Sequence, residues 1–377
     1  MIYLDNAATS YPKPKNVIQT MSSVMEKICA NPGRSGHNMS IASGSIVSST
    51  RGMIAKLINA PAPENIVFTQ NCTEALNLAI KGSLRPGMHV VTTLIEHNSV
   101  LRVLKTLEQR GFIRLTVVAP DPNGLVDPEA VMAAVNKRTK LIVMTHASNV
   151  LGTVQPIEKV GAYTRNKDIA FLVDAAQSIG ILPIDVQRYG IDMLAAPGHK
   201  ALYGPQGTGF LYISPRLTLN TLKEGGTGTS SQSLYQPMEI PERYESGTLN
   251  TPGIAGLFCG VRYVMKNQKR LMEHERELIK YAISSLSKIE GVKLYGSLDT
   301  SKKVGVLSFN AGNYQSGQVA DHLNEAGIAV RAGLHCAPGV HDFFGTMEQG
   351  MVRISVGSFN TVSDIDLLVS SVRNFVG

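Results

Sequence analysis

Short apolar runs typical of buried strands alternate with amphipathic helical segments through more than half of this 377-residue chain, and this alternation constrains the fold most. Strands that are separated by helices form crossover units, which build a mostly parallel sheet. In such sheets, ligands bind in the loops that follow the carboxyl ends of the strands. The sequence therefore predicts an α/β fold with its functional side chains just after the strands.

Residue periodicity gives the approximate bounds of these elements. Strands are expected at 65–69, 89–93, 112–118, 140–145, 169–173, 191–196 and 210–213. Helices are expected at 17–30, 45–57, 99–110, 128–136 and 156–165, with another after the polar turn that follows the first strand.

The C-terminal third has a different pattern, which begins with a long helical stretch at 254–289. It continues with short strands at 292–295, 304–309 and 328–331, and with helices at 317–326 and 363–375. We therefore expect an N-terminal arm (1–15), a large α/β domain (16–255) and a small α+β domain (256–377).

Composition limits the class of protein. With 43% hydrophobic residues the chain can bury a large core. It has no apolar run of about eighteen residues and no secretory signal pattern, so we expect a cytoplasmic protein without a membrane partner. The 36 Lys and Arg residues behind the net charge of +7 are spread along the chain, so we expect no nucleic-acid partner.

Four cysteines are scattered along the sequence, at Cys29, Cys72, Cys259 and Cys336. They are too few for a disulfide framework, and no Cys-x-x-Cys pair suggests a metal site. We interpret them as free thiols and expect no metal.

One lysine, Lys200, lies between a predicted buried strand and a glycine-rich return. Burial lowers the pKa of an amine and makes it a nucleophile that condenses with carbonyl groups. A solvated lysine in a turn is the ordinary alternative, because lysines are rarely buried. A second feature, upstream, favours the nucleophile.

That feature is Asp174, which follows the apolar run Phe171-Leu172-Val173. A carboxylate at the end of a parallel strand faces the ligand crevice. Paired with a buried lysine, it suits pyridoxal 5'-phosphate (PLP), whose ring nitrogen stays protonated when it is bonded to an acid. By itself, an aspartate in this position is more often a helix cap or a turn former.

The turn at Cys72 and Thr73 joins the first strand to a helix. The unpaired amides and positive dipole of a helix N-terminus bind phosphate. An ordinary N-cap formed by Thr73 is compatible with the same pattern.

Together these motifs, Asp-Ala-Ala-Gln at 174–177 and Gly-His-Lys at 198–200, resemble those of class V aminotransferases, within the fold-type I PLP enzymes. The resemblance runs nearly end to end and implies a large domain with a seven-stranded type of sheet. It also implies a homodimer with its active site at the interface. By the same resemblance, the expected cofactor-binding residues are Cys72, Thr73, His97, Asn149, Asp174, Gln177, His199, Lys200, Gly247 and Thr248.

The thiol most suited to chemistry is Cys336, in a loop bounded by glycine and proline. Arg331 and His335 lie close to it in sequence, a setting that favours thiolate. The other three cysteines are interpreted as packing residues or as part of the phosphate turn. Arg-x-Gly-x-His-Cys resembles the nucleophile motif of group II cysteine desulfurases and selenocysteine lyases.

This second resemblance implies that L-cysteine is converted to L-alanine while sulfur passes to Cys336 as a persulfide. Lys200, Asp174, His97 and Cys336 are the expected catalytic residues, and Arg353, Asn149, Arg331 and His335 are expected to bind the substrate. A sulfur-acceptor protein is a possible partner. Selenocysteine lyase or cysteine-sulfinate desulfinase activity is the nearest alternative. A class V aminotransferase, or a scaffold that has lost PLP, is a more distant one.

Overall fold

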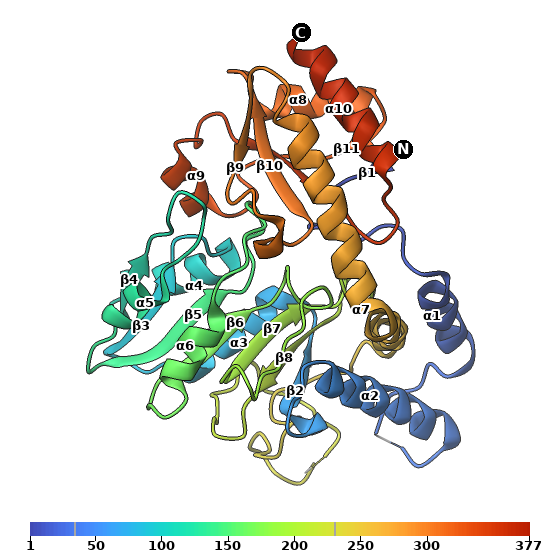
Figure 1. The fold of residues 1–377 in the computed structure, drawn as a ribbon. Helices are drawn as coiled ribbons and strands as arrows, with labels where there is room; N and C mark the ends of the chain where they lie inside the picture. The colour runs from blue at the N-terminus through green and yellow to red at the C-terminus, as the bar shows by residue number, and fades with distance from the viewer. Residues whose placement is uncertain (34, 230) are drawn as a thin grey trace.

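The computed structural model describes residues 1–33, 35–229 and 231–377 and has a seven-stranded sheet at its centre (Figure 1). The strand order is β2-β8-β7-β6-β5-β3-β4, and β8 runs antiparallel to both its neighbours while the other pairs are parallel. The strands are β2 (Ile66–Thr69), β3 (Met88–Thr93), β4 (Ile113–Val118), β5 (Thr139–Thr145), β6 (Ala170–Asp174), β7 (Met193–Pro197) and β8 (Gly209–Ile213). The predicted α/β fold with a mostly parallel seven-stranded sheet is therefore confirmed.

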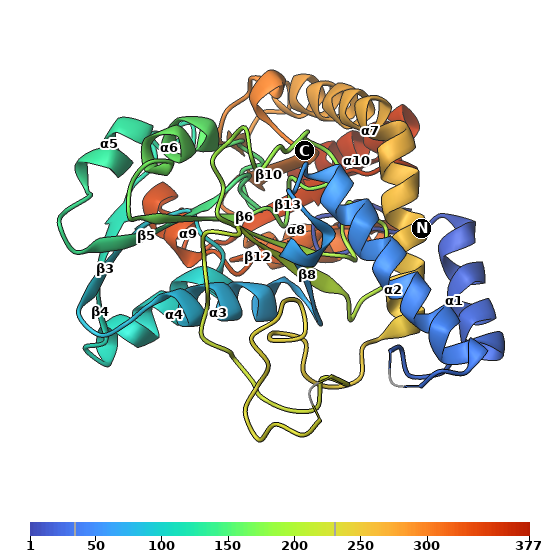
Figure 2. The ribbon, with the colours of Figure 1, turned by 90° about the horizontal axis from the view of Figure 1, so that it is seen from below.

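Helices cover both faces of this sheet, as the view from below shows (Figure 2). One face carries α3 (Cys72–Ser83) and α4 (Asn98–Gln109). The other carries α5 (Pro128–Ala133) and α6 (Ile157–Thr164), while α1 (Lys15–Lys27) and α2 (Asn38–Leu57) lie beside the first half of α7 (Thr251–Leu286).

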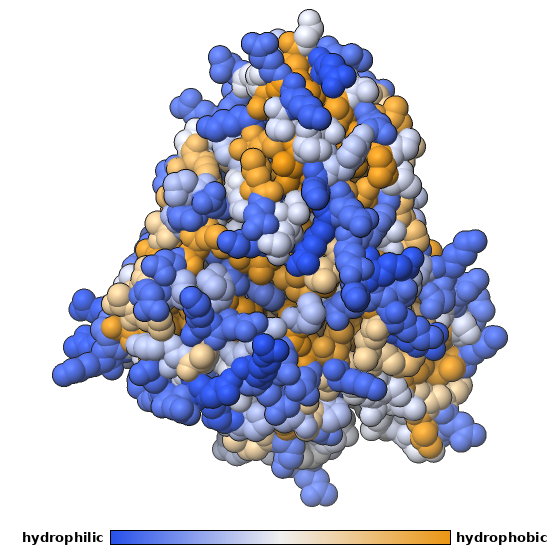
Figure 3. Space-filling model, viewed as in Figure 1, coloured by the Kyte–Doolittle hydropathy of each residue, from blue (hydrophilic) through white to orange (hydrophobic). Residues whose placement is uncertain are grey.

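Alternate residues of each central strand serve these two faces. In β6, Phe171 and Val173 belong to the core that includes α6 and α7, whereas Leu172 belongs to the core under α3 and α4. All three side chains are buried, as expected for a parallel strand with helices on both sides. Figure 3 shows hydrophilic side chains over much of the surface seen in Figure 1, with hydrophobic patches between them.

A second sheet forms the C-terminal part, with the antiparallel order β12-β13-β10-β9. Its strands are β9 (Val292–Tyr295), β10 (Val306–Ala311), β12 (Arg331–Gly333) and β13 (Met351–Ser355). Its helices are α8 (Ser316–Glu325), α9 (Pro338–Phe344) and α10 (Val362–Val376), with short 3-10 turns at Pro63–Asn65 and Thr300–Lys302 elsewhere.

The N-terminal arm packs against this C-terminal part. Its strand β1 (Ile2–Tyr3) pairs in parallel with β11 (Ile328–Ala329), and Leu4 is buried in the C-terminal core. The helix α7 runs through the boundary proposed at residue 255 and contributes buried residues to both cores (Figure 1). The proposed domain boundary therefore falls inside a continuous helix.

Four local expectations differ from the structure. The strand expected at 328–331 is two strands that join different sheets, β11 and β12. No helix was predicted where α9 lies, and no strand was predicted where β13 lies. The N-cap of α3 is Asn71, not Thr73, because the Asn71 side chain accepts the Glu74 amide at 2.9 Å. Cys29 is exposed beyond the end of α1, so it is not a packing residue.

In the described part of the chain, no helix has the length and apolar character needed to cross a membrane.

Candidate active site

A cavity of about 220 Å³ lies at the carboxyl ends of the central strands, where the arm and the second sheet close over them. Its walls include Cys72, Thr73, His97, Asn149, Asp174, Gln177, His199, Lys200, Arg331 and Arg353. These residues come from the loops after β2, β3, β5, β6 and β7 and from two strands of the C-terminal sheet. We refer to this space as the central cavity; it is large enough for a small organic molecule, since one water occupies about 30 Å³.

Asp174 and Lys200 lie at the ends of adjacent strands in the sheet. Asp174 is the last residue of β6 and Lys200 follows β7, so both side chains reach the central cavity. Burial raises the pKa of Asp174, although the Ala176 amide, 2.9 Å from Oδ1, and the nearby Lys200 amine act in the opposite direction. Burial also lowers the pKa of Lys200, so its amine gives up its proton more easily than a solvated lysine.

The first turn of α3 forms another wall of the central cavity. Because the Asn71 side chain caps Glu74, the preceding amides of Cys72 and Thr73 have no intrahelical acceptor. The Cys72 thiol donates to Oδ1 of Asp174 across 3.7 Å, and burial raises the pKa of that thiol. Cys72 therefore sits against the strand-end carboxylate, while the amides remain open to an anion.

His97 is the N-cap of α4, where its Nδ1 accepts the Ser99 amide at 3.0 Å. Burial, followed by the charge of Lys200, lowers the pKa of His97 to about 4. The ring is neutral at pH 7, and because Nδ1 accepts a hydrogen, Nε2 carries the proton.

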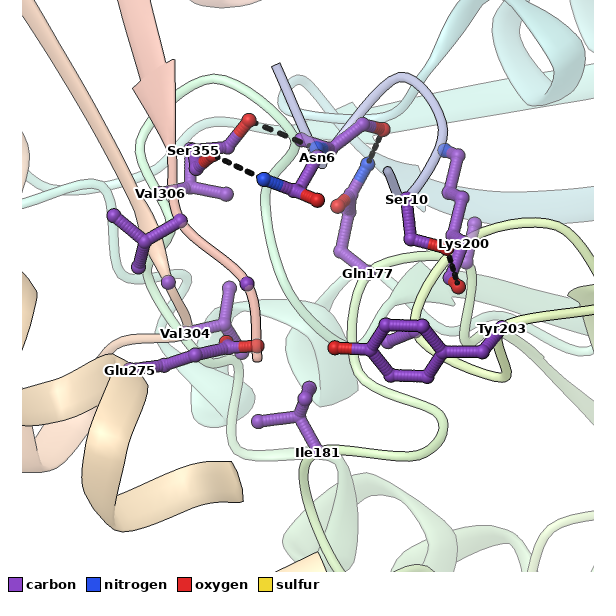
Figure 4. Close-up of a pocket in the computed structure, with 16 residues that line it drawn as sticks. Asn6, Ser10, Gln177, Ile181, Lys200, Tyr203, Glu275, Val304, Val306 and Ser355 are labelled. Atoms are coloured by element: carbon purple, nitrogen blue, oxygen red, sulfur yellow. Dashed lines mark hydrogen bonds between the residues drawn. The ribbon is translucent and has the colours of Figure 1, made fainter. Parts of the chain in front are cut away.

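The N-terminal arm is hydrogen bonded to the main chain of the loop that carries Lys200 (Figure 4). Ser10 donates to the carbonyl of Lys200 at 2.8 Å, and the Gln177 amide donates to the carbonyl of Ala7 at 3.0 Å. Lys13 donates to the carbonyl of His199 at 2.6 Å. The main chain around Lys200 is therefore fixed before any ligand binds.

The Cys336 loop lies beside the central cavity, in contact with Asn149 and Arg331, which line it; Cys336 itself does not line the cavity within one chain. Both His335 and Cys336 have left-handed backbone angles, with φ of 49° and 58°. The loop is tied to the large sheet by two hydrogen bonds, from the Asn149 side chain to the His335 carbonyl (2.7 Å) and from the Asn98 amide to the Cys336 carbonyl (2.7 Å). The thiol of Cys336 is partly exposed and accepts from Arg331 at 3.5 Å.

Two sets of predicted site residues lie outside the central cavity of their own chain: His335, and Gly247 with Thr248, which the resemblance assigns to the site of the other subunit. The His335 ring is buried beneath its loop, where Nε2 contacts the Met351 carbonyl at 2.9 Å, and it does not line the central cavity. Within one chain this imidazole therefore faces away from the central cavity, and the substrate-binding role expected of His335 stays a prediction. Within one chain, Gly247 and Thr248 line surface cavities beside residues such as Arg51 and Lys223 and do not line the central cavity.

Two acidic residues near the site had no role in the sequence prediction. Asp5 of the arm contacts Arg353 with Oδ1 2.6 Å from Nη2. Glu96 is buried directly before His97 and accepts from the Thr93 hydroxyl at 2.6 Å and from the Thr145 amide at 2.8 Å. Burial raises the pKa of Glu96 to about 8. The sequence signal for Glu96 was its position after a strand, but nothing in the sequence linked Asp5 to a residue 348 positions away.

The polar groups around the central cavity fit PLP. A buried carboxylate such as Asp174 is costly without a cationic partner, and a protonated ring nitrogen would supply one. The free amides of α3 suit a phosphate, and Nδ1 of His199 is buried without a partner in the described part of the chain. No cluster of metal-ligating side chains occurs among the residues that the structure describes.

The fold and this cavity define an enzyme of the class V aminotransferase family, to which the chain belongs; the family model "Aminotransferase class-V" matches residues 2–368. Within that family the chain belongs with the cysteine desulfurases. It is 37% identical to the "Probable cysteine desulfurase" of Methanothermobacter thermautotrophicus over 100% of this chain and 95% of that protein. It is 33% identical to the "Cysteine desulfurase" of Salmonella agona over 99% of this chain and 92% of that protein.

Solved structures agree with this assignment. The apo structure of a cysteine desulfurase from Thermococcus onnurineus superimposes with a TM-score of 0.94 at 34% identity, over 100% of this chain and 94% of that one. The cysteine desulfurase CsdA from Escherichia coli, in an S-sulfonic acid form, superimposes with a TM-score of 0.88 at 27% identity, over 99% and 94% of the two chains. The predicted family and fold type are therefore confirmed.

Proposed function

We propose that this protein is a PLP-dependent cysteine desulfurase that converts L-cysteine to L-alanine and transfers the sulfur to Cys336. The observation that carries the proposal is the meeting of Lys200, Asp174 and Arg353 in one cavity that the Cys336 loop borders. Lysine and aspartate suit a PLP enzyme, and a thiol beside them suits sulfur chemistry.

In this proposal, Asp174 pairs with the ring nitrogen, His97 lies against the ring, and Cys72, Thr73 and His199 hold the phosphate. Gln177 and Asn149 are assigned to the remaining polar contacts of the cofactor and substrate. When bound, PLP withdraws the electrons left at Cα of the amino acid once a bond there breaks.

Lys200 is proposed to move the proton at Cα. Its amine has a pKa lowered by burial, so it loses its proton more readily than a solvated lysine and can then act as a base. The planar guanidinium of Arg353, buried at the back of the cavity, is suited to bind the carboxylate of the amino acid.

Cys336 is proposed to accept the sulfur. Its thiolate attacks the sulfur of L-cysteine, so a sulfur–sulfur bond forms while the bond between Cβ and sulfur breaks. The carbon fragment gains a proton and leaves as L-alanine, and the enzyme keeps a persulfide. Nη2 of Arg331, 3.5 Å from Sγ, places a positive charge and a hydrogen-bond donor beside the sulfur.

The persulfide is proposed to pass to an acceptor protein or thiol. The protein is also proposed to act as a homodimer in which Gly247 and Thr248 serve the partner's site. Their position away from the central cavity of their own chain supports this assignment. The proposed cytoplasmic location is supported by the four scattered cysteines, which we interpret as free thiols.

The test compares the PLP-loaded wild type with Cys336→Ser. We expect the wild type to release one L-alanine for each sulfide in the presence of a reductant, and the variant to lose desulfuration while it keeps the absorbance of bound PLP. Full turnover by the variant would show that Cys336 is not the sulfur acceptor.

The same assay separates the alternatives. Selenocysteine and cysteine sulfinate are supplied in place of L-cysteine, because expulsion of selenium or sulfite needs no attack by Cys336. Faster turnover of either, unaffected by the serine substitution, would assign that activity instead. Formation of a keto acid would assign an aminotransferase.

A further inference from the structure

Two arginines of the central cavity lie directly opposite each other on neighbouring strands. In the register of β12 and β13, Arg331 pairs with Arg353, so both side chains leave the sheet on the same face. Like charges in this arrangement repel; burial is the main cause of the lowered pKa of Arg353, and the charge of Arg331 acts in the same direction. The pair therefore needs an anion nearby.

The N-terminal arm supplies one. Oδ1 of Asp5 lies 2.6 Å from Nη2 of Arg353, whose side chain is 1% exposed, while the Asp5 side chain is 20% exposed. The second nitrogen, Nη1, donates to the Asn149 carbonyl at 3.0 Å. A buried guanidinium with two acceptors on fixed main chain or side chain has little freedom to rotate.

The arm can hold Asp5 in place because it is itself anchored to β13. Asp5 forms a parallel bridge with Ser355, the Ser355 amide donates to the Leu4 carbonyl at 2.7 Å, and the Ala7 amide donates to the Ser355 hydroxyl at 2.8 Å. These bonds lie on both sides of Asp5 in the sequence. The carboxylate is therefore set beside Arg353 by main-chain geometry.

Some of the hydrogen-bond donors of Arg353 have no partner in the part of the chain that the structure describes and are available to a ligand. A guanidinium has five N–H groups, and two of those of Arg353 are used by Asp5 and Asn149. The Nε–H group has no acceptor among the described residues. Because Arg353 also lines the central cavity, donors remain for one further anion there.

We propose that Asp5 is a positioning residue that holds Arg353 in the orientation that receives the carboxylate of the amino-acid substrate. Asp5 balances the repulsion between the two arginines before the substrate binds and fixes the plane of the guanidinium. The inference rests on the proposed function, since it assigns Arg353 to the substrate carboxylate. It gives the N-terminal arm a part in substrate selection as well as in packing.

The experiment uses the PLP-loaded enzyme and two ligands that differ at one group, L-alanine and L-alaninamide. Both carry the same amine, but only L-alanine has a carboxylate. Dissociation constants are measured from the change in absorbance of bound PLP, so turnover is not needed. We expect Asp5→Ala to raise the dissociation constant of L-alanine roughly tenfold, which is the scale of a charge-assisted bidentate contact. The dissociation constant of L-alaninamide should change less than about twofold.

Two further variants separate positioning from arm docking. Asp5→Asn keeps an acceptor for Nη2, so L-alanine binding should stay within about threefold of the wild type. Asn360→Ala removes the hydrogen bond from Asn360 to the Tyr3 carbonyl (3.0 Å) without touching Arg353, so it should lower the melting temperature and leave the ratio of the two dissociation constants unchanged.

The inference is overturned if Asp5→Ala weakens the binding of both ligands equally, because that result indicates a structural role. It is also overturned if the substitution tightens the binding of L-alanine, because that result indicates competition between Asp5 and the ligand. A wild type that does not distinguish L-alanine from L-alaninamide would instead count against the role of Arg353 in the proposed function. The two failures are therefore distinguishable.

Discussion

The two sides of the central cavity are built by different means. On one side, Asp174 and Lys200 follow adjacent parallel strands whose main chains are hydrogen bonded to each other. On the other, Cys336 lies in a short loop with left-handed backbone angles, tied to the large sheet by contacts from Asn98 and Asn149. The strand-end side is fixed by the sheet, whereas the position of the thiol depends on a few side-chain and main-chain contacts.

This difference suits the two tasks. A group that moves a proton must keep its distance from the reacting carbon, because a small displacement costs much of the rate. A thiol that takes up sulfur and then passes it on must also reach an acceptor outside the cavity. Partial exposure of Cys336 is consistent with that need.

Substitution of Lys200 should give the largest effect, because it removes the proposed proton-transfer group from the rigid side. We expect Lys200→Ala to lower turnover of L-cysteine by more than about a thousandfold, as for other residues that carry the chemistry directly. Borohydride reduction followed by peptide mapping should place covalently attached PLP on Lys200 in the wild type.

Lys303 is an internal control for this measurement. It is also buried, with a pKa lowered by burial to about 7, but its amine donates to the Leu151 carbonyl and it does not line the central cavity. Burial alone should not attract the cofactor. Attachment of PLP to Lys303 rather than to Lys200 would contradict the assignment of the rigid side.

Substitution of Asn149 should have a smaller effect, chiefly on the loop side, because other residues of the central cavity also hold the cofactor. Asn149→Ala removes the donor to the His335 carbonyl and leaves that buried acceptor unpaired, which costs about 1–3 kcal/mol. We expect sulfur transfer to fall roughly tenfold or more while the loop shifts, with bound PLP retained; initial rates and PLP absorbance measure the two effects.

Asn310→Ala provides the matched control. Asn310 is also buried and donates to a main-chain carbonyl, that of Gly350, at 3.1 Å, but its side chain makes no hydrogen bond to the Cys336 loop among the described residues. The Asn310→Ala variant should lose about as much stability as Asn149→Ala, with little change in the rate of sulfur transfer. If both variants lose activity equally, the contact from Asn149 does not position the thiol.

The same contrast explains what could be predicted from the sequence. The locations of Asp174 and Lys200 follow from local rules, since an apolar strand that ends in a polar residue places it at the ligand edge of a parallel sheet. The direction of the His335 ring could not be predicted, because it depends on left-handed backbone angles at His335 and Cys336.

Contacts between distant parts of the chain were also beyond prediction. The pairing of Asp5 with Arg353 requires the arm to lie along β13, and a two-residue strand carries too little periodicity to show this. The choice of Asn71 over Thr73 as N-cap differs from the expectation by two residues, which is within the usual uncertainty of helix ends.

The smallest expected effect is on stability and concerns Glu275, where the N-terminal arm, the two sheets and α7 meet. A cavity of about 30 Å³ lies behind the Lys200 loop and is lined by residues of the arm, of both sheets' loops and of α7, among them Glu275 (Figure 4). Glu275 is buried, and burial raises its pKa to about 8, opposed by a hydrogen bond from the Gly305 amide. Gly305 has no room for a side chain, since a Cβ there would lie 2.5 Å from Oε2 of Glu275.

This raised pKa gives a stability that falls with rising pH. Between pH 4.5, the ordinary pKa of a glutamate, and about pH 8, the folded state keeps the proton while the unfolded state releases it, so the folded state loses relative stability throughout that window. Above about pH 8 the folded state has lost all of the stability that the protonated Glu275 provided. Glu275→Gln cannot ionise, so the variant should match the wild type near pH 5 and melt at a higher temperature near pH 8, with the same desulfurase activity.

The measurement is the melting temperature of the PLP-loaded protein between pH 5 and 9. Glu273→Gln, on the same helix but with a side chain 54% exposed, should leave the pH dependence unchanged. If the Glu275→Gln protein loses stability with pH as steeply as the wild type, Glu275 ionises freely in the folded state.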